Sequence, residues 1–393
     1  MKTVYVDNNA TTKVAPEVLE AMLPYFTELY GNPSSMHFFG GQVQKKVNEA
    51  REQVADFLGA DPSEIVFTSC GTESDNAAIF GTLDSYPEKR HFVTSRVEHP
   101  AVLNVCPYLE RKGYRVTQVS VDREGHLDLD ELKESLTEET GLVSIMYANN
   151  ETGVIFPIEE IGQIVKSKGI PFHVDAVQAA GKIPLNMKKS TIDMLSISGH
   201  KLHAPKGIGV LYIRKGTKFS PFIIGGHQER GRRGGTENVP YIIGLGKACE
   251  LAKKNLEEEN TRVRALRDYL EAKILEKIPN TLINGDRNHR LPNTLSVSFE
   301  YVEGESILLL LSDLGICASS GSACTSGSLE PSHVLRAMGV PFTAAHGSIR
   351  FSLSIYNTKE EMDYIIEHLP PIIQKLRDIS PFWKDYLKSR EKG

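Results

Sequence analysis

Between residues 65 and 213 the sequence alternates short apolar runs with longer stretches of helical spacing. The apolar runs predict seven strands, at residues 65–68, 91–95, 115–119, 142–147, 171–174, 194–197 and 208–213. Most of them are separated by helical patterns, at residues 74–83, 101–112, 130–136 and 158–168. Strands that alternate with helices pair in parallel and need helices on both faces of the sheet. We therefore expect an α/β fold around a mostly parallel seven-stranded sheet, with the last, hairpin-like strand antiparallel.

A second, smaller unit is expected after this sheet. A long charged helical stretch, residues 241–277, links the two and is expected to bend or break. Outside the sheet region, strands are predicted at residues 293–299 and 348–354, and helices at residues 16–29, 43–58, 305–314 and 359–376. This pattern favours a large domain of residues 15–260 and a small α+β domain of residues 1–14 and 261–393. The end of the chain, residues 388–393, is expected to be a solvated tail.

Charge and cysteine usage exclude several classes of protein. The 393 residues carry a net charge of −5, which indicates no nucleic-acid or anionic-membrane partner. No apolar run is long enough to cross a bilayer, and the first ten residues do not have the character of a signal peptide. The five cysteines are spread singly, so we expect no disulfide framework and a location in a reducing cytoplasm.

Lys201 lies in a short segment that follows a predicted buried strand. Ser198, Gly199 and His200 precede it, directly after the apolar run at residues 194–197. Lysine avoids burial unless a partner meets its charge, and desolvation lowers the pKa of its amine. A neutral amine can attack a carbonyl carbon, so Lys201 is a candidate Schiff-base lysine. A solvated loop lysine is the alternative interpretation.

Further reactive side chains follow other predicted strands at their carboxyl ends, where open α/β sheets bind ligands. Gly71 and Thr72 begin a helix, whose N–H groups either bind an anion or are simply capped. His99 precedes the next helix, and Asn150 lies in a loop that a turn would also explain. Asp175 ends an apolar strand, where a carboxylate needs a cation or backbone donors. Together with Lys201, these groups match the phosphate, ring and aldehyde of pyridoxal 5′-phosphate (PLP).

These motifs resemble those of cysteine desulfurases, class V aminotransferases of fold type I that depend on PLP, and most closely those of the nitrogen-fixation (NifS-like) type. The resemblance covers nearly the whole chain, and its most specific parts are residues 7–12, 69–75, 201–207 and 226–233. It implies conversion of L-cysteine to L-alanine, with the sulfur left as a persulfide on Cys324. A selenocysteine lyase or an aminotransferase on the same fold, or a sulfur carrier without catalysis, are the alternatives.

The resemblance also implies residue roles. Lys201 would bind the cofactor aldehyde, Asp175 the ring nitrogen, and His99 would stack on the ring and carry protons. Further cofactor contacts would come from Gly71, Thr72, Asn150, Gln178, Ser198, Gly199 and His200, and from Thr236 of a neighbouring subunit in a homodimer. Arg350 would bind the substrate carboxylate through its planar fork, and Asn8 and Asn32 lie in segments that would border the substrate.

Cys324 is the residue that separates this reading from an aminotransferase. The small residues around it, at 319–328, are typical of a mobile, exposed loop in which a thiol can ionise and attack. A disulfide or metal pair with Cys317 is an alternative, and Cys324 is also a candidate transient iron–sulfur ligand. The expected acceptor of its sulfur is an iron–sulfur scaffold protein, including one for nitrogenase assembly. The other cysteines, Cys70, Cys106 and Cys249, are expected to be structural.

Overall fold

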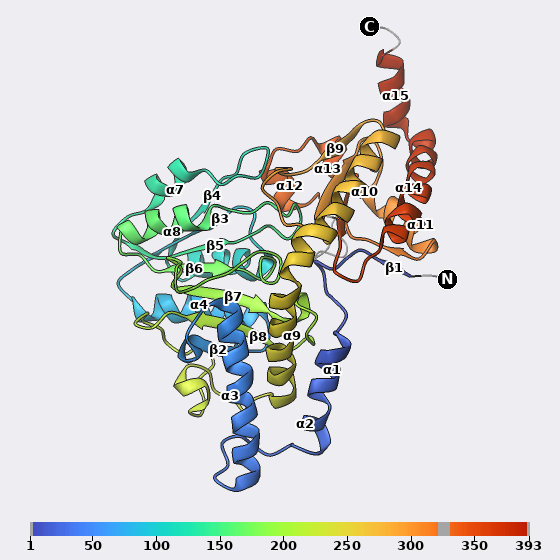
Figure 1. Cartoon of the computed structure of the whole chain (residues 1–393). Coiled ribbons are helices and arrows are strands. Elements are labelled where there is room, and N and C mark those ends of the chain that lie inside the picture. Colours follow the sequence, from blue (N-terminus) through green and yellow to red (C-terminus); the bar gives the residue numbers. More distant parts are fainter. Residues whose placement is uncertain (1–2, 321–330, 391–393) are drawn as a thin grey trace.

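A seven-stranded sheet forms the centre of the larger part of the molecule (Figure 1). The structure, a computed structural model, describes residues 3–320 and 331–390. The strand order is β2-β8-β7-β6-β5-β3-β4. The strands are β2 (Ile65–Thr68), β3 (His91–Ser95), β4 (Arg115–Val119), β5 (Thr140–Met146), β6 (Phe172–Asp175), β7 (Met194–Ser198) and β8 (Gly209–Ile213). Only β8 runs antiparallel to its neighbours, which confirms the predicted sheet and its exception.

Both faces of this sheet are buried. Successive residues of one strand point to opposite faces and pack into different apolar cores. In β3, Val93 packs into one core and Phe92 into the other. The first core is covered by α1 (Pro16–Met22), α3 (Phe38–Leu58), α7 (Leu129–Ser135), α8 (Ile158–Ser167) and α9 (Val239–Glu258). The second core is covered by α4 (Gly71–Ser85), α5 (Pro100–Leu103) and α6 (Cys106–Arg111). This two-sided burial explains why the strands are continuous apolar runs.

A smaller unit is built on an antiparallel sheet in the order β12-β10-β9. Its strands are β9 (Thr281–Ile283), β10 (Thr294–Phe299) and β12 (Ser348–Ser352), with β1 (Val4–Tyr5) paired to β11 (Ile316–Cys317) beside them. The helices α10 (Arg264–Lys277), α11 (Gly304–Asp313), α14 (Lys359–Ile379) and α15 (Pro381–Arg390) complete it. Because Val4, Val6 and Val263 belong to its separate core, we propose the division into residues 15–260 and residues 1–14 with 261–393. However, α12 (His333–Ala337) and α13 (Phe342–Ala345) pack into the core of the large sheet.

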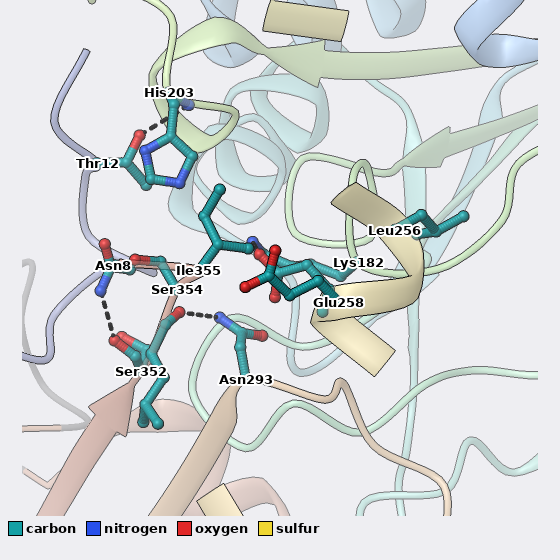
Figure 2. A network of polar contacts seen from close by, with 12 residues as sticks. Asn8, Thr12, Lys182, His203, Leu256, Glu258, Asn293, Ser352, Ser354 and Ile355 are labelled. Atoms are coloured by element: carbon teal, nitrogen blue, oxygen red, sulfur yellow. Dashed lines mark hydrogen bonds and ion pairs between the residues drawn. The ribbon is translucent and has the colours of Figure 1, made fainter. Parts of the chain in front are cut away.

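The predicted long helix is interrupted where the two units meet. A π-helical turn, Glu259–Val263, separates α9 from α10. Its Glu259 accepts a hydrogen bond from Lys182 at 2.7 Å, and both side chains are buried. Figure 2 shows this junction, where Asn8 donates to the Ser352 carbonyl at 2.9 Å and Thr12 accepts from the backbone of His203. These polar contacts hold the N-terminal segment between the two units.

Three helix predictions need correction. The helices predicted at residues 16–29 and 101–112 are each divided, because Pro24 and Pro107 have no N–H to continue the helical hydrogen bonds; the pieces are α1 with α2 (Pro24–Thr27), and α5 with α6. α3 begins at Phe38 and not at residue 43, since His37 accepts from Gly40 N–H and caps it. The expected solvated tail is exposed at residues 388–390, which form the last turn of α15. Among the described residues, no helix is long and apolar enough to span a membrane.

Candidate active site

A cavity of about 600 Å³ opens at the carboxyl ends of β3, β5, β6 and β7, and is bounded on its other side by the small unit. Its size is that of a site for a cofactor with a small substrate. Ten of the residues that the sequence predicts line this one cavity: Gly71, Thr72, His99, Asn150, Asp175, Gln178, Ser198, His200, Lys201 and Arg350. The strand order brings them together, because parallel strands end at the same edge of a sheet.

Lys201 is the last residue of a 3-10 turn, Gly199–Lys201, that follows β7 directly. Its Nζ donates to the carbonyls of Asn9 at 2.5 Å and Ala10 at 2.7 Å. Gly199 does not line the cavity, but a Cβ there would come within 2.7 Å of the Ile208 side chain. A glycine is thus needed for the turn to pass close to the next strand, and the turn directs the lysine toward the cavity.

Two buried carboxylates lie beneath the cavity. Asp175 ends β6 and accepts a hydrogen bond from Val177 N–H at 2.9 Å. Burial raises the pKa of Asp175 to about 6. Asp75, from α4, is also buried, and burial together with Asp175 raises its pKa well above the ordinary value. A cation bound in the cavity would offset the cost of ionising Asp175 in this apolar place.

The start of α4 has features that suit an anion. Cys70 caps the helix by accepting a hydrogen bond from Glu73 N–H. At Gly71 a Cβ would lie 3.0 Å from the Val177 side chain, so only a glycine keeps this corner open. The Ser198 hydroxyl beside it is buried and has no hydrogen-bond partner among the described residues. A helix N-terminus next to an unsatisfied hydroxyl is suited to a phosphate group.

Arg350, on β12, reaches the cavity from the small unit and is almost fully buried. It makes an ion pair with Asp7 at 2.9 Å and donates to the Asn150 carbonyl at 2.9 Å. The guanidinium Nε has no partner among the described residues. Asp7 is a residue that sequence reasoning missed, although a buried arginine requires a carboxylate partner.

Three predicted site residues lie elsewhere in this chain. Asn8 does not border the cavity: its side chain holds the N-terminal segment to β12. Asn32 is exposed and accepts a hydrogen bond from Ser34 N–H at 2.9 Å, away from the cavity. Thr236 lines a separate cavity of about 170 Å³, together with Thr68 and other residues. Within one chain, these three residues do not line the cavity that contains Lys201.

The cysteine predictions have different outcomes. Cys106 and Cys249 are fully buried, and burial raises the pKa of the Cys106 thiol to about 11, as expected for structural cysteines. Cys317 lies in β11, and no disulfide joins any two of the four cysteines that the structure describes. Cys324, and with it the alternative of a pair with Cys317, lies outside the described residues.

Comparison with known proteins identifies the family. Residues 4–365 match the family described as Aminotransferase class-V. A cysteine desulfurase of Trichormus azollae is 66% identical over 385 residues, 98% of this chain and 96% of that protein. The cysteine desulfurase NifS of Azotobacter vinelandii is 58% identical over 384 residues, with the same coverage. A solved NifS-like protein superposes with a TM-score of 0.90 at 44% identity, covering 95% of this chain and all of that one.

The chain belongs to the class V aminotransferases. Within them, its relatives at 58–66% identity are cysteine desulfurases, so the resemblance read from the motifs is confirmed. The fold-type I architecture of these PLP-dependent enzymes is confirmed as well.

The cavity of this class V aminotransferase fits PLP, the cofactor of its family. The orphaned Ser198 hydroxyl and the open corner at Gly71 suit the phosphate, with Thr72 and His200 beside them. Asp175 is a buried carboxylate whose ionised form a cation would stabilise. The protonated ring nitrogen would provide that cation. Lys201 lies on the same cavity and suits the aldehyde.

Sequence reasoning missed a second group of cavity residues. Glu151 lines the cavity and accepts a hydrogen bond from Ser332, and burial raises its pKa to about 7. His333 lines the cavity next to it. Glu151 had a signal, because it follows the Asn150 loop at a strand end. Ser332 and His333 had none, since they come from the segment after the predicted mobile loop and reach the cavity only through α12.

Proposed function

We propose that this chain is a cysteine desulfurase that converts L-cysteine to L-alanine and keeps the sulfur as a persulfide on Cys324. The observation that carries the proposal is that Lys201, Asp175 and Arg350, from three distant parts of the chain, line one cavity. When bound, PLP supplies an electron-accepting ring that stabilises the negative charge released at the substrate Cα.

The chain's own residues bind the substrate and move its protons. The Arg350 guanidinium faces the cavity with unsatisfied capacity at Nε, which suits it to bind the cysteine carboxylate. The Lys201 amine is the group placed to take the proton from Cα and to return a proton to the product. Asp175 would hold the positive charge at the ring nitrogen, since its carboxylate is buried and shielded from water.

The sulfur transfer is assigned to Cys324. Its thiolate attacks the sulfur of the bound cysteine and forms an S–S bond. The bond between that sulfur and Cβ breaks, and its electron pair stays with the carbon skeleton, which is then protonated to alanine. The sulfur is thereby oxidised by two electrons and the carbon is reduced by the same two.

We also infer a homodimer and a protein acceptor for the sulfur. Leu19, Leu23, Phe26 and Phe38 are exposed on α1, α2 and the start of α3, at one end of the molecule (Figure 1). An apolar surface of this kind suits an interface with a second copy. Thr236 lies outside the cavity of its own chain, which is consistent with a contact to the partner's phosphate. The proposed acceptor is an iron–sulfur scaffold protein in a reducing cytoplasm.

Visible spectra of the purified protein, with and without L-cysteine, combined with alanine and sulfide assays, test this function. Cys324→Ala is expected to keep the cofactor absorbance and its response to cysteine but to release no sulfide with a reductant. Lys201→Ala is expected to lose turnover. Normal sulfide release by Cys324→Ala would overturn the assignment of the sulfur step.

The same assays separate the alternatives. Turnover only with selenocysteine would replace the proposal by a selenocysteine lyase, and amino transfer to a keto acid would replace it by an aminotransferase. A colourless protein that carries sulfur without turnover would indicate a carrier.

A further inference from the structure

Three imidazoles line the cavity, those of His99, His200 and His333. The Nδ1 of His200 already hydrogen-bonds to the Thr11 hydroxyl at 3.2 Å. The hydrogen bond of His99 leaves its ring only a donor. His99 Nδ1 accepts a hydrogen bond from Ala101 N–H at 3.1 Å. The neutral ring therefore carries its proton on Nε2. Burial and the nearby Lys201 lower the pKa of His99 to about 4, so the ring is neutral near pH 7. His99 can stack on a ligand and donate from Nε2, but its lone pair is already used by the backbone.

The imidazole of His333 has the arrangement opposite to that of His99. Its Nε2 lies 3.0 Å from the carbonyl oxygen of Glu98. A carbonyl only accepts, so Nε2 carries the proton and Nδ1 carries the lone pair. No residue in the described part of the chain hydrogen-bonds to Nδ1. Burial lowers the pKa of His333, which keeps the ring neutral and its lone pair available.

His333 is held in place from both sides. It is the first residue of α12, and Ser332 before it caps that helix by accepting from Val334 N–H at 3.0 Å. The same Ser332 hydroxyl donates to Glu151, from the loop after β5. The ring of His333 itself is fixed by the carbonyl of Glu98, the residue before His99 in the sequence. The imidazole is thus anchored to the ends of two sheet strands and lines the cavity with Lys201.

Resting on the proposed function, we propose that His333 is a further catalytic residue, whose Nδ1 accepts the hydrogen bond and then the proton of the substrate thiol. The attacking thiolate of Cys324 forms the S–S bond with the substrate sulfur. The bond between that sulfur and the substrate Cβ breaks, and its electron pair stays with carbon. The S–H proton moves to Nδ1, and the S–H electron pair stays on the terminal sulfur of the persulfide. The resulting imidazolium keeps its Nε2–H bond to Glu98 and releases the proton to water when the product leaves.

A comparison of cysteine with selenocysteine tests this role, because a selenol is already ionised near pH 7 and a thiol is not. His333→Gln keeps an N–H donor for the Glu98 carbonyl but has no basic nitrogen. With the holoenzyme we expect kcat for alanine formation from cysteine to fall about 100-fold or more, and with selenocysteine less than about 10-fold. An equal loss with both substrates, or no loss with cysteine, would overturn the proposal.

Two controls keep the result interpretable. His346→Gln removes an imidazole that directly follows α13 and does not line the cavity. This variant is expected to keep both activities. If the wild-type protein forms no alanine from cysteine, the proposed function fails, which is a different outcome from an unaffected His333→Gln.

A second readout needs no turnover. In ¹⁵N spectra of histidine-labelled holoenzyme, the His333 signals are assigned by their loss in His333→Gln. We expect the tautomer with the proton on Nε2 for His333, and a lone pair on Nδ1. A proton on Nδ1 would leave no acceptor for the thiol and would overturn the proposal.

Discussion

The most informative single residue is Asp175, a carboxylate that is buried at the end of an apolar strand. Among the described residues, its carboxylate accepts a backbone hydrogen bond only from Val177 N–H, which is too little to hold a buried charge. The sequence alone left open whether this aspartate caps the following turn or binds a cation. The structure shows that Asp175 caps the following turn and also lines the cavity, so the two interpretations are compatible.

Asp175→Asn should keep the hydrogen bond from Val177 but lose the charge. We expect alanine formation to fall by at least about 100-fold, equivalent to about 3 kcal/mol in the barrier, with weaker cofactor retention. Steady-state kinetics and the absorbance of bound PLP measure both effects. Asp193→Asn is the matched control, because Asp193 likewise accepts from a backbone N–H, of Phe172, at the opposite end of the strands. A similar loss in the control would contradict a specific role for Asp175.

Glu151 gives a prediction for the pH dependence of stability. Burial raises its pKa from 4.5 to about 7 in the folded protein, so the folded state holds a proton that the unfolded state releases. This group therefore lowers stability as pH rises from about 4.5 to 7, and the full cost is present above pH 7. Glu151→Gln can still accept from Ser332 and should be more stable than wild type by up to about 3 kcal/mol at pH 8.

Urea unfolding at pH 5 and pH 8 checks this prediction, with the exposed Glu134→Gln as control. The stability difference between Glu151→Gln and wild type should grow with pH. A difference that stays constant or shrinks would contradict the assignment of a buried, protonated Glu151.

At the scale of elements, the π-helical turn between α9 and α10 is where the two units meet. The turn places Glu259 in a buried position next to Lys182, and Asn260 donates to the Lys182 carbonyl at 2.8 Å. A regular helix through this point would move these side chains to another face, so the irregularity is coupled to the ion pair. The sequence predicts a break here but not its position, because no proline or glycine marks it.

Lys182→Met should leave Glu259 buried without its partner and destabilise the protein by about 3–5 kcal/mol. The double variant Lys182→Met/Glu259→Leu should recover most of this loss, since the unpaired charge is then gone. Denaturant unfolding of both variants measures the difference. If the single and double variants are equally unstable, the loss comes from packing and not from the charge.

At the scale of the whole molecule, the position of Thr236 argues for a site that two subunits complete. In one chain it lies in a cavity separate from that of Lys201. Hybrid dimers made from Lys201→Ala and Thr236→Val subunits test whether it acts on the partner. Each variant alone should be impaired, but in the hybrid one site would combine both changes and the other would be intact.

Random mixing of the two variants should then restore about a quarter of the wild-type activity, because half of the dimers are hybrids with one intact site. Sedimentation measures the dimer itself. No recovery after subunit exchange would mean that Thr236 acts within its own chain.

Local patterns of residues were enough to predict the sheet, its antiparallel strand and most of the cavity. Apolar runs identify strands buried on both faces, and parallel strands bring their carboxyl ends to one edge, so Gly71, His99, Asp175 and Lys201 could be predicted to meet. The motif resemblance added Arg350 and the family. These features depend on local periodicity and on residues close to strand ends, which a sequence displays directly.

The partners of those residues follow from the three-dimensional packing and could not be predicted from local patterns. Three contacts join segments far apart in the chain. They are the ion pair of Arg350 with Asp7, the hydrogen bond of Glu151 with Ser332, and the hydrogen bond that fixes the tautomer of His333. The hydrogen bond from Asn8 to the Ser352 carbonyl likewise joins distant segments. Such contacts depend on how the small unit packs against the sheet, and no local pattern of residues encodes that packing.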